Sequence, residues 1–147
     1  MAVILASSCL LGCECRYKGD GCKCDALIKL AESNTIIGVC PEQMGGLPTP
    51  RDPAERQGDK VISCAGKDVT KAYTKGAETA LYFAKLNHVD FAVMKAKSPS
   101  CGKGLIYDGT FTGNKIPGNG VTVELLNANG TVSYTHLRAH ETCADLV

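Results

Sequence analysis

The sequence lacks an apolar stretch long enough to cross a lipid bilayer, and it lacks long runs of basic or acidic residues. Its 16 Lys and Arg nearly balance its 15 Asp and Glu, which leaves a formal net charge of +1. The composition therefore predicts neither a membrane protein nor one that binds a nucleic-acid polymer. The first residues also lack the basic segment of a secretory signal, and too few residues precede Cys9 for a lipoprotein signal. We expect a cytoplasmic protein.

Cysteine, by contrast, is abundant, with an odd number of nine among 147 residues. Without a signal peptide, metal binding or catalysis is a better interpretation than a disulfide framework. Thiols also pack as small buried hydrophobic side chains, which is the role we expect for Cys64 after the apolar pair Val61-Ile62. Hydrophobic residues make up 44% and charged residues 21% of the chain, a balance typical of one globular domain with a real core.

Short apolar runs at residues 2–6, 36–39 and 91–94 predict buried strands, with a last strand from residue 131. Helical patterns at residues 26–32, 69–87 and 121–128 lie between them. This alternation predicts an α/β fold: a small, mostly parallel sheet flanked by helices in a Rossmann-like three-layer arrangement. Two glycines and three prolines in residues 43–55 predict either an ordered loop or a segment without structure there. Residues 58–63 are expected to form a hairpin with residues 67–69.

The last fifteen residues are similar to a peptide translated from a sequencing adapter, a known contaminant of assembled environmental sequences. We therefore interpret residues 1–132 as a single α/β catalytic domain and residues 133–147 as a non-native tail. In this interpretation His136, His140 and Cys143 have no function. The alternative is a native C-terminal helix that contains Glu141.

Three cysteines lie a short distance past three of the predicted strands: Cys9, Cys40 and Cys101. Because ligands gather at the carboxyl ends of parallel strands, we expect these thiols to meet at one edge of the sheet. Such a set suits an iron–sulfur cluster that lacks one protein ligand, or a zinc ion with an open position. The three lack the short knuckle spacing usual for zinc, but spacing alone does not choose between the metals, or against three unconnected structural cysteines.

Seven motifs occur in order over about residues 3–132: Ser8-Cys9-Leu10-Leu11-Gly12, Cys15-Arg16-Tyr17, Cys40-Pro41-Glu42, Gly45-Gly46-Leu47-Pro48-Thr49-Pro50-Arg51, Gly66-Lys67-Asp68-Val69-Thr70, Lys97-Ser98-Pro99-Ser100-Cys101-Gly102 and Ile106-Tyr107-Asp108-Gly109-Thr110-Phe111. Together they resemble the small bacterial family that includes the thiouracil desulfidases. The resemblance implies a [4Fe–4S] cluster held by Cys9, Cys40 and Cys101. It also implies a catalytic acid at Glu42 and a catalytic serine at Ser98.

The function that this resemblance implies is non-redox removal of sulfur from a thiolated nucleobase or similar thioamide, converting thiouracil to uracil and hydrogen sulfide. An iron without a protein ligand is a Lewis acid for the soft thiocarbonyl sulfur and would accept the sulfide. Glu42 would activate water, and Ser98 would hold or protonate a ring nitrogen. A non-catalytic zinc or iron–sulfur module in sulfur trafficking is the alternative, and a metal-free ligand-binding domain is a third interpretation.

Two further side chains are candidates for substrate binding, Arg51 and Ser100. Arg51 could instead tie the proline-rich loop to Glu55, the role we favour, or pair with Glu42. Ser100 could instead support a sulfur of the cluster.

The loop that follows the first motif contains four more cysteines: Cys13, Cys15, Cys22 and Cys24. Cys15 belongs to the Cys-Arg-Tyr motif, whereas the other three are additional to the family pattern. They could bind zinc in two Cys-x-Cys pairs, although surface thiols are the interpretation we favour.

Overall fold

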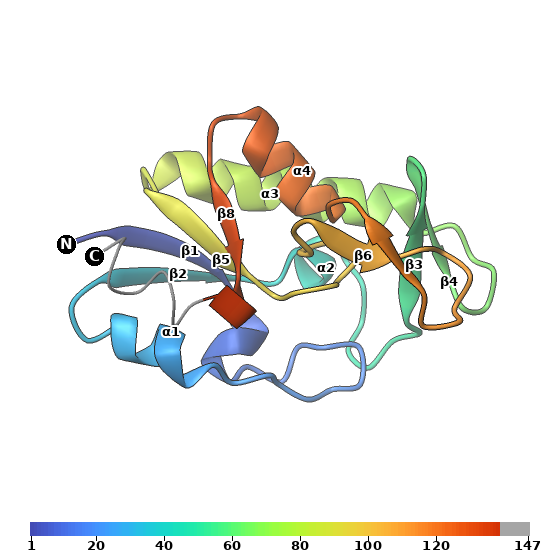
Figure 1. The fold of residues 1–147 in the computed structure, drawn as a ribbon, viewed down its shortest axis with the longest axis horizontal. Coiled ribbons are helices and arrows are strands. Elements are labelled where there is room, and N and C mark those ends of the chain that lie inside the picture. The colour runs from blue at the N-terminus through green and yellow to red at the C-terminus, as the bar shows by residue number, and fades with distance from the viewer. Residues whose placement is uncertain (139–147) are drawn as a thin grey trace.

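The central element of the computed structural model is a parallel sheet of four strands in the order β2-β1-β5-β8 (Figure 1). The strands are β1 (Val3–Ser7), β2 (Thr35–Val39), β5 (Phe91–Met94) and β8 (Ser133–Thr135), and every neighbouring pair runs parallel. The structure describes residues 1–138, so His140, Glu141 and Cys143 lie outside the described residues. The predicted α/β class is confirmed, and the three strands expected at 2–6, 36–39 and 91–94 are present within one residue at each end.

Helices cover both faces of the sheet, with α1 (Asp25–Leu30) on one side and α3 (Thr70–Leu86) and α4 (Val121–Ala128) on the other (Figure 1). Because successive strand residues point to opposite faces, Ile4 and Ala6 pack with the α1 layer, whereas Leu5 packs with α3 and α4. Each of these three side chains is fully buried. Burying an aliphatic side chain of the size of Leu or Ile stabilises the fold by about 1.5–3 kcal/mol.

The remaining elements are short and differ in part from the sequence prediction. A one-turn helix, α2 (Pro41–Met44), begins with the proline after Cys40 and occupies part of the expected loop. The expected pairing of residues 58–63 with residues 67–69 is present as an antiparallel bridge from Ile62 to Asp68, with backbone hydrogen bonds on either side of it. In addition, β4 (Lys60–Ser63) pairs antiparallel with β3 (Ala54–Gln57), a partner that the sequence did not predict. A two-residue turn joins β3 to β4, and Gly58 there adopts the left-handed conformation that such turns require (φ 62°).

The glycine-rich segment after Cys101 forms another hairpin, β6 (Leu105–Tyr107) with β7 (Lys115–Pro117). Cys64 is exposed just beyond β4, so its expected role as a buried side chain is wrong. Strand alternation explains this, because Val61 and Ser63 take the buried face. Within residues 1–138, no helix combines the length and apolar character that crossing a membrane demands.

Strand β8 falls at the start of the segment that we interpret as a tail. Ser133 is buried, and the Tyr134 ring packs edge-to-face on Phe91 with centroids 6.0 Å apart. After β8, the Nδ1 atom of His136 accepts a hydrogen bond of 3.1 Å from the backbone N–H of Ala96. These residues therefore complete the sheet, and the domain boundary expected at residue 132 lies one residue before a strand. The adapter origin of the segment stays a prediction.

Candidate active site at the carboxyl edge of the sheet

A cavity of about 500 Å³ opens at the carboxyl ends of the strands. It lies where the chain order reverses, since β1 pairs with β2 on one side and with β5 on the other. Crevices at such reversals are the usual ligand sites of open parallel sheets. Segments that follow β1, β2 and β5 line the cavity, together with parts of the β3 and β6–β7 regions.

The three predicted ligands all line this cavity, as expected: Cys9, Cys40 and Cys101. Cys9 and Cys101 are buried and Cys40 is half-buried. Cys9 belongs to a short 3₁₀ helix (Ser8–Leu11) directly after β1, and Cys40 is the residue before α2. A fourth thiol that lines the cavity, Cys15, is buried within hydrogen-bonding reach of both Cys9 and Cys40.

The surroundings of Cys40 and Cys101 disfavour the ionisation of these two thiols in the protein alone. The hydrogen bond with the Cys15 thiol, followed by burial, raises the pKa of Cys40 well above its ordinary value. Burial, with the nearby Glu42 carboxylate, raises the pKa of Cys101 to about 12 although Ser7 opposes the change. A bound positive metal centre would remove this penalty, because thiolates are its ligands.

The positions of these thiols bear on whether they suit a single zinc ion or an iron–sulfur cluster. Within residues 1–138, no three His, Cys, Asp or Glu side chains lie together in a way that could hold a single metal ion. The described residues therefore show no preformed single-ion site, although Cys15 lies within hydrogen-bonding reach of both Cys9 and Cys40. An iron–sulfur cluster is a larger body whose thiolate ligands bind different iron atoms, so it suits thiols placed around a cavity.

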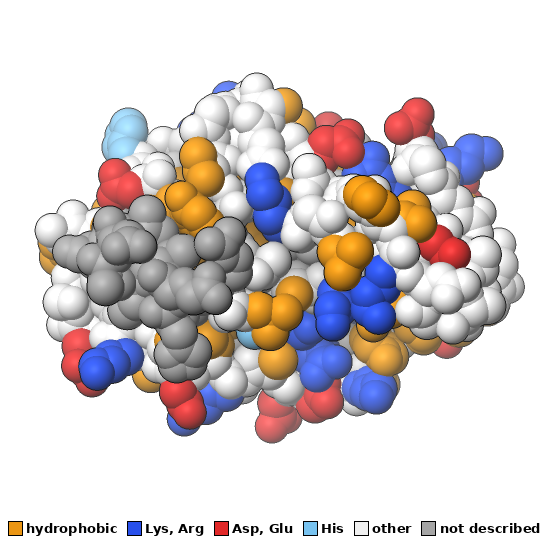
Figure 2. Space-filling model, in the orientation of Figure 1, with side chains coloured by type: hydrophobic (Ala, Val, Ile, Leu, Met, Phe, Trp, Pro, Cys, Tyr) orange, Lys and Arg blue, Asp and Glu red, His pale blue; other side chains and the backbone are white. Residues whose placement is uncertain are grey.

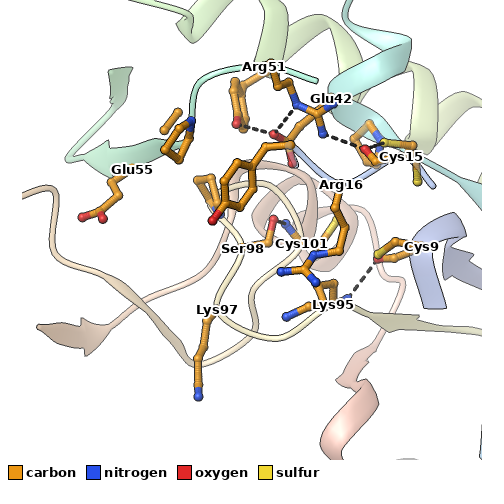
Figure 3. Close-up of a pocket in the computed structure, with 18 of the residues that line it drawn as sticks. Cys9, Cys15, Arg16, Glu42, Arg51, Glu55, Lys95, Lys97, Ser98 and Cys101 are labelled. Atoms are coloured by element: carbon orange, nitrogen blue, oxygen red, sulfur yellow. Dashed lines mark hydrogen bonds and ion pairs between the residues drawn. The ribbon is translucent and has the colours of Figure 1, made fainter. Parts of the chain in front are cut away.

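Glu42 projects into the cavity from α2 and is held through one oxygen atom. Its Oε1 accepts a hydrogen bond of 2.6 Å from the phenol of Tyr73 and one of 3.2 Å from Nε of Arg51. Arg51 also donates to the carbonyl oxygen of Cys15 (Figure 3). A further hydrogen bond runs from Arg51 to the carbonyl oxygen of Pro48. Arg51 is therefore the ion-pair partner of Glu42 rather than of Glu55.

The favoured tie between Arg51 and Glu55 is accordingly wrong. Glu55 instead accepts hydrogen bonds from the backbone N–H groups of Gly109 (3.0 Å) and Phe111 (3.2 Å). It thus fastens the β6–β7 loop beside the cavity, whose lining includes Phe111. Phe111 has a left-handed backbone (φ 58°), an unfavourable conformation for an aromatic residue, which this carboxylate helps to hold.

The two serines of the last cysteine motif differ in position. Ser98 lines the cavity, as expected for a catalytic residue. Ser100 is fully buried, bonds Thr122 through its hydroxyl at 2.7 Å and lies beside the Cys101 thiol. It is not part of the cavity lining. The structure therefore gives no support to substrate binding by Ser100, and its contact with Cys101 fits the alternative of supporting a ligand sulfur.

Four cationic side chains line the same cavity: Arg16, Arg51, Lys95 and Lys97. Lys and Arg side chains are also grouped near the middle of the face shown in Figure 2. Within residues 1–138, neither lysine forms an ion pair. The positive charge of the four side chains compensates the negative charge of Glu42 and of any ligand thiol that ionises in this cavity.

Sequence reasoning missed Tyr73 as a site residue because it falls on the apolar face of a long helix. One signal was available: a tyrosine on a buried face needs a hydrogen-bond partner for its hydroxyl. Burial, with the adjacent Glu42 carboxylate, raises the pKa of Tyr73 far above its usual range, so the phenol stays protonated and is the donor.

Comparisons with known proteins agree over nearly the whole chain. The model of the 2-thiouracil desulfurase family matches residues 4–136. The uncharacterized protein YbbK of Bacillus subtilis (strain 168) is 43% identical over 138 residues, which cover 87% of this chain and 91% of YbbK. The solved structure of the [4Fe-4S]-dependent thiouracil desulfidase TudS is similar with a TM-score of 0.93 at 40% identity, and covers 99% of this chain and 98% of TudS.

Proposed function

This chain belongs to the 2-thiouracil desulfurase family, and we propose that it is a [4Fe–4S]-dependent thiouracil desulfidase. The family resemblance of the seven sequence motifs is thus confirmed. The observation that carries the proposal is the meeting of Cys9, Cys40 and Cys101 around one cavity that also contains Glu42. A cavity of about 500 Å³ is of the size usual for small-molecule sites, which favours a free thiolated heterocycle as the substrate.

The residues that would hold the cluster are Cys9, Cys40 and Cys101. A [4Fe–4S] cluster bound by three thiolates supplies one iron without a protein ligand, a Lewis acid suited to a thiocarbonyl sulfur. The Ser100 hydroxyl lies within hydrogen-bonding reach of the Cys101 sulfur and favours its ionised form. The cluster needs its cysteines reduced, and thiols are kept reduced in the cytoplasm, which favours that compartment for the reaction.

The net reaction is hydrolysis of the C=S group by one water molecule. The C=S bond breaks, a C=O bond forms, and hydrogen sulfide leaves with no change of oxidation state. In this proposal Glu42 takes a proton from the attacking water and returns it to the departing sulfur. Within residues 1–138, both hydrogen bonds that reach this carboxylate end on Oε1. Its Oε2 therefore has the free lone pairs that proton abstraction needs.

In this proposal Ser98 donates a hydrogen bond to the substrate. Its Oγ already accepts hydrogen bonds from two backbone N–H groups, those of Ser100 and Cys101, each at 3.1 Å. The hydroxyl proton is left to donate to an acceptor in the cavity. The developing carbonyl oxygen of the substrate, or a ring nitrogen that has lost its proton, would be such an acceptor.

The test is anaerobic reconstitution followed by turnover. We expect brown protein, iron and acid-labile sulfide near a 4:4 ratio as for any [4Fe–4S] protein, and conversion of thiouracil to uracil with equal release of sulfide. Colourless protein that retains stoichiometric zinc would support the accessory-module alternative. A loaded cluster without release of sulfide from any thiolated pyrimidine would refute the desulfidase activity.

A further inference from the structure

Helices α2 and α3 touch backbone to backbone, at two glycines. A Cβ atom on Gly76 of α3 would overlap the carbonyl oxygen of Pro41, and one on Gly45 would overlap the carbonyl oxygen of Ala72. Such close approach is possible only without side chains at these positions. The contact presses α2, a single turn that carries Glu42, against the first turns of the long helix α3.

This contact brings Tyr73 to Glu42. Tyr73 lies in the first turn of α3 and is only 2% exposed. Its phenol bonds Oε1 of Glu42 at 2.6 Å, across 31 residues of sequence. Arg51 reaches the same oxygen at 3.2 Å from the proline-rich loop, with a side chain that is 6% exposed.

We propose that Tyr73, together with Arg51, is a positioning residue that holds Oε1 of Glu42 and so directs Oε2 toward the reacting water. The inference rests on the proposed function, in which Glu42 is the group that moves protons.

The packing of α3 alone does not call for a hydroxyl at this position. The Tyr73 ring would be equally buried as phenylalanine, and a buried hydroxyl is unfavourable unless it is hydrogen-bonded. The phenol therefore acts through its bond to Glu42.

Two donors from separate elements are needed because a glutamate side chain has three rotatable bonds. The contact of α2 with α3 positions the backbone of Glu42 but does not restrict rotation about these side-chain bonds. Two hydrogen bonds to one oxygen fix both the position and the rotation of the carboxylate. Misplacement of a reacting group by about 1 Å can cost about 10²-fold in rate.

The variant that tests this is Tyr73→Phe, with Tyr82→Phe as its control. Tyr82 lies on the same helix but is 61% exposed. In anaerobically loaded protein we expect the iron content and visible absorption of both variants to equal the wild type. For thiouracil, kcat of Tyr73→Phe should fall about 10–100-fold, as for loss of a hydrogen bond to a charged group, with KM nearly unchanged. Tyr82→Phe should retain wild-type kcat.

A double-mutant cycle separates positioning from general support of the fold. If Tyr73 acts through Glu42, adding Tyr73→Phe to Glu42→Gln should lower the residual kcat less than about twofold. Two outcomes would overturn the inference. One is that Tyr73→Phe lowers kcat by the same factor in the wild type and in Glu42→Gln; the other is that Tyr73→Phe retains the wild-type kcat.

A second cycle needs neither cluster nor substrate. Unfolding of the metal-free protein should show that Tyr73→Phe and Glu42→Ala are coupled, because each removes one end of the same hydrogen bond. Additive effects would overturn the inference. If the wild type holds a cluster but releases no sulfide, the desulfidase proposal fails, and this stability cycle still decides whether Tyr73 holds Glu42.

Discussion

The hydroxyl oxygen of Ser98 accepts a hydrogen bond of 3.1 Å from the backbone N–H of Cys101. A candidate catalytic group and a candidate cluster ligand thus belong to one hydrogen-bonded turn, which the N–H of Ser100 joins through the same oxygen. The turn follows β5 and lines the cavity. The orientation of the Ser98 hydroxyl and the position of the Cys101 sulfur therefore depend on each other.

Replacing Ser98 should lower both the rate of turnover and the retention of the cluster. Ser98→Ala removes the donor and leaves two N–H groups without their acceptor, so we expect turnover to fall about 10–100-fold and the cluster to be lost faster in air. Ser98→Thr retains the hydroxyl and should retain most of the activity. Steady-state kinetics and the decay of visible absorption check this. Full activity of Ser98→Ala would exclude a catalytic hydroxyl.

Serine at any one of the three proposed ligands should prevent stable assembly of the cluster. A hydroxyl is a harder and far less acidic ligand than a thiol, and two thiolates do not hold a [4Fe–4S] cluster as three do. Cys64→Ser is the matched control, since this thiol is exposed near β4 and outside the cavity lining. Iron and acid-labile sulfide analysis measures the outcome. Wild-type cluster content in the Cys9→Ser, Cys40→Ser or Cys101→Ser variant would remove that residue from the ligand set.

Glu42→Gln should separate turnover from cluster binding. The amide retains an oxygen for Tyr73 and Arg51 but cannot accept a proton from water. Loss of general acid–base help of this kind typically costs about 10²–10⁴-fold. We expect unchanged colour and iron content with sulfide release reduced by this factor. Near-normal turnover would transfer the proton-moving role to another group, and Ser98 would be the first to test.

Gly76→Ala should disturb the contact between α2 and α3. Alanine favours a helix over glycine by about 1 kcal/mol, but its methyl group would meet the Pro41 carbonyl, and overpacking of this kind costs about 1–3 kcal/mol. We expect a lower melting temperature and a lower kcat, because Glu42 moves away from Tyr73. Lys75→Ala, at an exposed position next to it, is the control and should change neither quantity. Equal kcat in the two variants would show that the helix contact does not set the carboxylate position.

Two truncations test how far the fold extends into the adapter-like segment. A chain that ends at Arg138 retains every element of the described residues and is the reference. A chain that ends at Val132 loses β8, which exposes the edge of β5 and removes the Tyr134 ring from Phe91, so it should melt at a lower temperature. Melting curves by circular dichroism compare the two chains. Identical curves would show that β8 contributes nothing to stability.

Much of the site was predictable because it depends on short-range patterns. The alternation of apolar runs and helical patterns is local, and parallel strands place their carboxyl ends together whatever their order. The meeting of Cys9, Cys40 and Cys101 followed from this rule alone. The family resemblance added Glu42 and Ser98 through motifs adjacent to two of these cysteines.

The partners of β4 show where local patterns are incomplete. Residues 58–63 were expected to pair with residues 67–69, and Ile62 does bridge Asp68. The sequence did not predict that β4 also pairs with β3, through a two-residue turn at the left-handed Gly58. A strand has two edges, and a periodic pattern alone does not say which segments pair with them.

The sequence by itself determined the fold class, the alternation of the main strands and helices, and the three thiols at one edge of the sheet. Only the tertiary structure decided which oxygen of Glu42 is held, by Tyr73 and Arg51, and that Arg51 does not bind Glu55. These contacts depend on how closely α2 approaches α3 at Gly45 and Gly76. A hydrogen bond forms only within a few tenths of an ångström of its ideal length, and packing, not sequence periodicity, sets distances to that accuracy.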